Sequence, residues 1–154
     1  MKESGEAQRL ITALRLSPHP EGGWYRETLR VDGPERATVT AIHFLLEAGQ
    51  RSHWHTVDAT EIWCWHAGSP LRLGHAAGDQ DAPAWVMLGP DIEAGQLPQF
   101  TIPTGHWQAA EATDGWALVS CIVAPGFDFA GFRLAAPGWS PGLEREKGPP
   151  AGRG

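Results

Sequence analysis

Glycine and proline residues divide this chain into short segments. Its 154 residues include 19 glycines and 13 prolines. The runs between them are about five to nine residues long and rich in aromatic and β-branched side chains. Runs of this kind have the length of strands and are too short for most helices. The sequence therefore predicts an all-β protein.

One short helix is expected, near the N-terminus. Leu10, Ile11 and Leu14 have the spacing of one helix face, and Ser17-Pro18 ends the run. The rest of the chain divides into about ten strands without an internal repeat, so a sandwich, a jelly roll and a barrel are all compatible with it. The strands are expected at residues 24–31, 38–46, 52–57, 61–66, 71–75, 85–88, 99–103, 106–111, 116–124 and 129–134.

Length and charge limit the domain count and the classes of partner. A chain of 154 residues forms one domain, which we assign to residues 1–136. Residues 137–154 form a Pro/Gly-rich tail that we expect to be too poor in apolar side chains to pack. The formal net charge of -6 opposes binding to phosphate backbones and anionic lipid. We therefore expect neither nucleic acid nor membrane as a partner.

The cellular compartment is inferred from two absences in the sequence. The first twenty residues lack the apolar core of a signal peptide, and no run approaches the roughly 20 apolar residues of a membrane span. Cys64 and Cys121 are the two cysteines, too few for a disulfide framework. We expect a cytoplasmic protein with reduced thiols.

The segment from Gly49 to Gly68 holds the strongest candidate for chemistry. His53 and His55 are two residues apart on an expected strand, so their imidazoles should point to one face. Glu61 follows a short turn, and hairpin pairing would bring its carboxylate toward both histidines. Two imidazoles and one carboxylate suit a divalent metal ion. A carboxylate among the neighbouring tryptophans also needs a partner, because an unpaired buried charge is costly.

This pattern resembles the first motif of the cupin superfamily, a glycine followed by His-x-His, a glutamate and a second glycine. Gly49, His53, His55, Glu61 and Gly68 match it. The resemblance implies a double-stranded β-helix, the cupin jelly-roll barrel, with a cavity at one mouth.

The second cupin motif is matched in part. Pro103 and Gly105 supply its Pro-x-Gly, but Gln108 stands where the family has a histidine. The metal set that the resemblance implies is therefore His53, His55, Glu61 and Gln108, with His106 as the alternative fourth ligand. A glutamine oxygen coordinates a hard cation weakly, so this departure argues against a tightly held metal.

Three further blocks resemble a family of single-domain, RmlC-like cupins. They are HPEGGWYRET at residues 19–28, TAIHFLL at residues 40–46 and PGFDF at residues 125–129. The resemblance implies an epimerase-like fold and a homodimer, but no specific reaction. Within these blocks, Tyr25 is a candidate general acid. His19 is expected to be an ordinary solvated histidine of a turn.

The candidate ligand pocket combines residues from these motifs, namely Glu21, Arg26, Trp63, Trp65 and His106. We expect a small polar metabolite there, and three functions stay open. The first is a metal-dependent enzyme acting on a sugar or a hydroxy acid, with one divalent ion and no organic cofactor. The second is a metal-free epimerase or isomerase in which His55 is the base, Glu61 orients it and Tyr25 is the acid. The third is a binding protein without catalysis.

Overall fold

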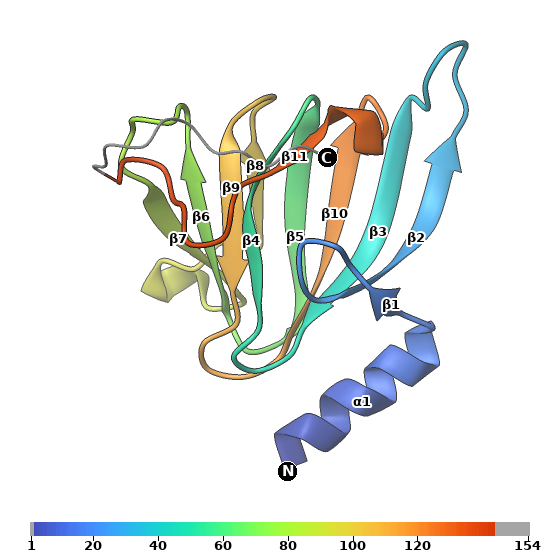
Figure 1. Cartoon of the computed structure of the whole chain (residues 1–154). Coiled ribbons are helices and arrows are strands. Elements are labelled where there is room, and N and C mark those ends of the chain that lie inside the picture. Colours follow the sequence, from blue (N-terminus) through green and yellow to red (C-terminus); the bar gives the residue numbers. More distant parts are fainter. Residues whose placement is uncertain (1, 144–154) are drawn as a thin grey trace.

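Two antiparallel sheets face one another and enclose the core (Figure 1). The computed structural model describes residues 2–143. The larger sheet has the order β1-β2-β3-β10-β5-β8 and the smaller one the order β11-β4-β9-β6-β7. The larger sheet consists of β1 (Ser17–Pro18), β2 (Trp24–Val31), β3 (Val39–Leu46), β10 (Ala117–Ala124), β5 (Thr60–Gly68) and β8 (Gln99–Ile102). The smaller sheet consists of β11 (Phe132–Leu134), β4 (Arg51–Val57), β9 (Trp107–Glu111), β6 (Leu71–Ala76) and β7 (Ala84–Leu88).

The all-β prediction and the N-terminal helix are confirmed. Helix α1 (Lys2–Leu14) lies outside the two sheets, next to β1 (Figure 1). Its residues Ala7 and Ile11 are buried against Leu45 of β3. Within residues 2–143 no helix is both long enough and apolar enough to cross a bilayer.

Alternation of side chains along the strands builds the interior. On β10, Val119, Cys121 and Val123 are buried while the residues between them are half-buried, which is the period of two expected for a strand with one face inward. The largest buried cluster includes Phe44 and Trp63 and leaves room for a cavity beside it. The fold is therefore a barrel that is packed in one part and hollow in another.

Two local expectations are corrected. Strands β4 and β5 do not form a hairpin, because β4 pairs with β9 and β11 whereas β5 pairs with β10 and β8. They are consecutive in the chain but belong to opposite sheets. The expected last strand also begins later, since residues Phe129–Gly131 form the 3-10 turn η2 and β11 begins at Phe132.

The first part of the expected tail packs against the barrel. Trp139 is only 6% exposed, and its ring centroid lies 4.6 Å from that of Trp107. Trp54 and Ala135 belong to the same buried cluster. The expectation that the segment from Pro137 onward does not pack is therefore wrong over residues 137–143, because one large ring buries enough apolar surface to hold it. Residues 144–154 lie outside the described part of the chain.

Candidate functional site

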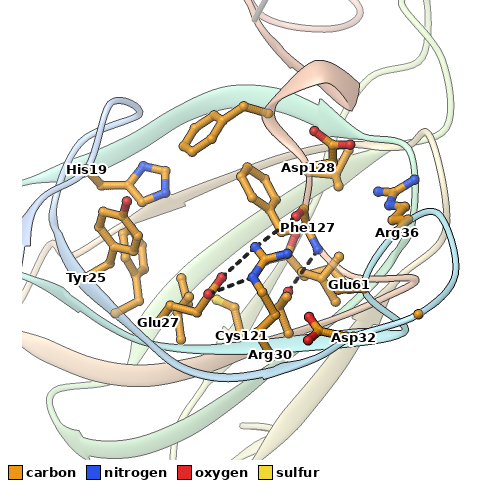
Figure 2. Close-up of a pocket in the computed structure, with 18 of the residues that line it drawn as sticks. His19, Tyr25, Glu27, Arg30, Asp32, Arg36, Glu61, Cys121, Phe127 and Asp128 are labelled. Carbon is orange, nitrogen blue, oxygen red and sulfur yellow. Dashed lines mark hydrogen bonds and ion pairs between the residues drawn. The ribbon is translucent and has the colours of Figure 1, made fainter.

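A cavity of about 660 Å³ lies between the two sheets. Figure 2 shows His19 and Tyr25 at one side of it and Arg36 and Asp128 at the opposite side. Carboxyl, imidazole, phenol, thiol and phenyl groups share its wall, so the cavity can contact both polar and apolar parts of a ligand. Its polar lining residues include His19, Glu21, Tyr25, Glu27, Arg30, Asp32, Arg36, His55, Glu61, Cys121 and Asp128.

The turn at residues 19–23 places Glu21 inside the barrel. The backbone oxygen of Glu21 accepts the N–H of His53 at 3.0 Å, which holds the turn against β4. Gly22 has φ +112, and a Cβ there would lie 2.2 Å from the carbonyl oxygen of Arg51. Close backbone approach and a positive φ both demand glycine at this position. Gly22 is therefore needed to bring the Glu21 carboxyl to the cavity.

We predict that Gly22→Ala destabilises the fold by roughly 2–3 kcal/mol and moves Glu21 out of the site. Urea unfolding measures the stability. Gly49→Ala is the matched control, because Gly49 also has a positive φ but a Cβ there meets nothing within 4 Å. Equal losses in the two variants would contradict the packing argument.

The hydrogen bonds of His55 determine which of its nitrogens carries the proton. Nδ1 lies 2.7 Å from the carbonyl oxygen of His53, which can only accept, so Nδ1 is the donor. In the neutral ring Nε2 then has a free lone pair, and it lies 3.5 Å from Oε1 of Glu21. Nε2 of His55 is therefore available as a base. The His53 carbonyl provides the orienting contact that we had expected from Glu61.

His19 presents the opposite tautomer. Its Nδ1 accepts the backbone N–H of Glu21 at 3.1 Å, so in the neutral ring Nε2 carries the hydrogen. The same Nδ1 lies 3.6 Å from Oε1 of Glu21. This is not an ion pair, because the nitrogen's lone pair already accepts a hydrogen bond. Burial, as the largest effect, lowers the pKa of His19 and favours the neutral ring.

Glu61 accepts the last hydrogen bond in a chain that begins at Trp63 and passes through Gln108. The indole N–H of Trp63 donates to Oε1 of Gln108 at 2.7 Å, which fixes the orientation of the amide. Nε2 of Gln108 therefore donates to Oε1 of Glu61, at 3.1 Å. Gln108 acts here as a hydrogen-bond donor to the carboxyl group, and its own oxygen is occupied.

Burial controls the protonation of the carboxyl groups. The pKa of Glu61 is raised to about 7, with burial as the largest cause; His55 opposes the shift and the nearby Glu21 carboxylate adds to it. Burial also raises the pKa of Glu21, against His19 and a hydrogen bond from the Ser52 hydroxyl. Burial lowers the pKa of His55. Near neutral pH the site therefore holds a neutral imidazole beside a carboxyl group that readily gains or loses a proton.

Of the residues singled out in the sequence, four line this cavity: Glu21, Tyr25, His55 and Glu61. The prediction that His53 and His55 share a face is wrong. The pairing of β4 with β9 shifts its register between Ser52 and His55. His53 instead lines a second pocket beside Trp139, and its Nε2 contacts the carbonyl oxygen of Ala136 at 3.0 Å.

The other expected pocket residues lie outside the cavity wall. Arg26 is exposed, and Trp65 donates its indole N–H to the carbonyl oxygen of Ser69 at 2.9 Å. Trp63 is 1% exposed and acts through Gln108 rather than by facing a ligand. His106 does not line the cavity either.

Sequence reasoning missed some residues that the cavity brings together. His19 was expected to be solvated, yet it is mostly buried and its ring centroid lies 4.4 Å from that of Tyr25. Its place within the HPEGG block was the available signal. No sequence motif pointed to Cys121, Arg30 or Arg36, because their place in the cavity depends on the pairing of distant strands.

Comparison with known families agrees with this architecture. The family model described as Cupin superfamily (DUF985) matches residues 8–135, most of the chain. The chain belongs to this family. The match includes the turn at residues 19–23 and both motif strands, so the cavity of this cupin lies wholly within the matched region.

Solved structures similar to this cupin include two at considerable sequence identity. A hypothetical protein from Leishmania major is 36% identical with a TM-score of 0.75, covering 82% of this chain and 85% of that one. A protein from Shewanella oneidensis is 38% identical with a TM-score of 0.78, covering 83% of each chain. A cupin-2 domain protein from Rhodospirillum rubrum, at 16% identity and a TM-score of 0.52, covers 79% of this chain and 70% of that one and shares the fold. No curated protein matches this cupin.

Proposed function

We propose that this cupin binds a small polar metabolite in the cavity and catalyses proton transfer on it, in the manner of an epimerase or isomerase. The observation that carries the proposal is that a neutral His55 ring and the buried Glu61 carboxyl group line the same cavity of about 660 Å³. Nδ1 of His55 donates to the carbonyl oxygen of His53 at 2.7 Å, which leaves the lone pair of Nε2 for a ligand.

His55 is the base of the proposed reaction. Its Nε2 takes a proton from a carbon next to a carbonyl group of the ligand, and the electron pair of that C–H bond moves toward the carbonyl oxygen. A neutral imidazole with a defined tautomer is suited to this step, because its lone pair is already aimed into the site. Return of a proton to the carbon, on the same or the opposite face, completes the exchange.

Glu61 is the acid that protonates the carbonyl oxygen. Its pKa, raised to about 7 by burial, leaves much of it protonated near neutral pH. Tyr25 stays an alternative acid, because its side chain lines the same cavity. A proton donor matched to the working pH can contribute a rate factor of about 10² to 10⁴.

The experiment has two stages. A panel of sugars and small carbonyl compounds is first screened for those that raise the thermal stability of the full-length protein. Each binder is then incubated with the protein in D2O, and deuterium at carbon is measured by mass spectrometry. We expect exchange in at least one binder, lost in His55→Gln. If no binder gains deuterium at carbon, the catalytic proposal is wrong and the protein is a binding protein without catalysis.

A metal-dependent enzyme is the second candidate, and the predicted ligand set does not fit it well. The oxygen of Gln108 accepts the Trp63 indole N–H, and His53 lies in the other pocket. Within residues 2–143 no group of three or more His, Cys, Asp or Glu side chains is arranged to hold a metal ion.

We predict that untagged protein purified without chelator holds well under one metal ion per chain. Elemental analysis measures this, with the double variant His53→Ala/His55→Ala as the comparison. Near-stoichiometric metal that disappears in the double variant would restore the metal-dependent candidate.

A further inference from the structure

The wall of the cavity carries more acid than base. Six carboxyl side chains line it, against two guanidinium groups, and four of the six lie outside the buried pair Glu21 and Glu61, in which burial favours the neutral form. A cleft lined by charge of one sign concentrates ligands of the opposite sign. The carboxyl groups are those of Glu21, Glu27, Asp32, Glu35, Glu61 and Asp128.

Both guanidinium groups are already paired. Arg30 contacts the two carboxylate oxygens of Glu27, each at 3.0 Å. Arg36 contacts those of Asp58 at 2.7 Å and 3.2 Å and also donates to the carbonyl oxygen of Gly126 at 2.7 Å. A phosphate or carboxylate entering the cavity would compete with the carboxylates that already bind both arginines. The unmatched charge at the rim is therefore negative.

Two phenylalanine rings line the cavity together with Arg30 and Arg36. Phe127 and Phe129 are in edge contact with ring centroids 4.7 Å apart, and Phe129 is 46% exposed. An organic cation is attracted to the face of a phenyl ring, and nearby carboxylates add to that attraction. Asp128 lies between these two phenylalanines in the chain and lines the same cavity.

We infer that the ligand of this cavity carries an ammonium group and no phosphate group. This inference rests on the proposed function, because it concerns the ligand of the same site. The ligand then belongs to the class of amino-substituted small polar metabolites, and it binds with its cationic group near the rim and its reacting carbon near His55.

The test measures the charge of the cavity directly. A reporter thiol is placed at the rim as Pro34→Cys in a Cys64→Ser/Cys121→Ser chain, since Pro34 is exposed and lines the cavity. The reference is the native Cys64 in a Cys121→Ser chain, because Cys64 does not line the cavity. Each protein is reacted with methanethiosulfonates that carry either a trimethylammonium or a sulfonate group. Because both reagents react with the same thiol in each protein, the ratio of the two rates does not depend on how accessible that thiol is.

We expect the cation-to-anion rate ratio to be about tenfold higher at residue 34 than at Cys64 at low ionic strength, and to fall as salt is added. Adding Asp32→Asn/Glu35→Gln should lower the ratio, whereas the exposed Asp114→Asn, outside the cavity wall, should not. A ratio at residue 34 no higher than at Cys64 would overturn the inference. Such a result leaves the proton-transfer proposal intact, because deuterium exchange is measured whatever the charge of the ligand.

The compounds that raise the thermal stability of the protein provide a second test of the ligand's charge. With cationic, neutral and phosphorylated compounds present in equal numbers, we expect amino compounds among the binders and phosphorylated ones absent. A phosphorylated compound that binds more tightly than its amino counterpart would also overturn the inference.

Discussion

Glu61→Gln is expected to slow deuterium exchange by about 10² to 10⁴. The glutamine keeps the shape of the side chain but cannot give up a proton. The variant should still fold, because an amide at this position avoids burying a group that can become charged. Exchange rates of a binder from the screen, measured for both proteins by mass spectrometry, provide the test.

The pH dependence separates Glu61 from Tyr25 as the acid. Because the pKa of Glu61 is raised to about 7, its protonated form disappears above that pH, and the exchange rate should fall there. The rate should also fall at low pH, where His55 becomes protonated. Tyr25→Phe should keep the alkaline limb near pH 7 and Glu61→Gln should lose it. An alkaline limb that persists near pH 7 in Glu61→Gln would contradict the assignment of the acid to Glu61.

Trp63→Ala is expected to lower the free energy of unfolding by about 3–5 kcal/mol. The ring is 1% exposed and belongs to the largest buried cluster, where it packs edge-on against Phe44 with centroids 5.8 Å apart. Its loss also leaves the oxygen of Gln108 without its donor. Chemical denaturation at constant pH measures the effect.

Trp65→Ala is the matched control on the same strand. Trp65 is half-buried and donates only to a backbone carbonyl, so its removal should cost less than that of Trp63. A third variant, Trp63→Phe, keeps most of the packing but removes the indole N–H. Trp63→Phe should lower the deuterium-exchange rate while its free energy of unfolding stays closer to that of the parent than that of Trp63→Ala does. Equal losses of unfolding free energy in Trp63→Ala and Trp65→Ala would contradict the placement of Trp63 in the core.

The strands could be predicted because their side chains alternate. Residues 117–124 show this clearly, and the observed strand β10 lies within the expected range of 116–124. The two-residue strand Ser17–Pro18 could not be predicted, because serine and proline there are equally good signals for the end of a helix. Its pairing with β2 exists only in the folded barrel.

The candidate site was predictable in part. The motif singled out His55 and Glu61, and both line the cavity. The period of two failed for His53 because the register of β4 shifts between Ser52 and His55, and such a shift depends on the partner strand rather than on local sequence. The sequence also places Gln108 where the second cupin motif has a histidine. Its contacts with Trp63 and Glu61 required the three-dimensional structure.

The homodimer and the cytoplasmic location stay predictions from the sequence. Size-exclusion chromatography with light scattering measures the oligomeric state of the full chain, and a mass of twice 16.7 kDa is expected.

An NMR titration of the Glu61 carboxyl group tests its proposed role as the proton donor. Glutamate side chains labelled with 13C at the carboxyl carbon are titrated by NMR in the parent protein and in Glu61→Gln. We predict one carboxyl with a midpoint near 7 that is missing from the variant. If every glutamate of the parent titrates below about 5, as ordinary carboxyls do, Glu61 is not the proton donor and the proposed mechanism is wrong.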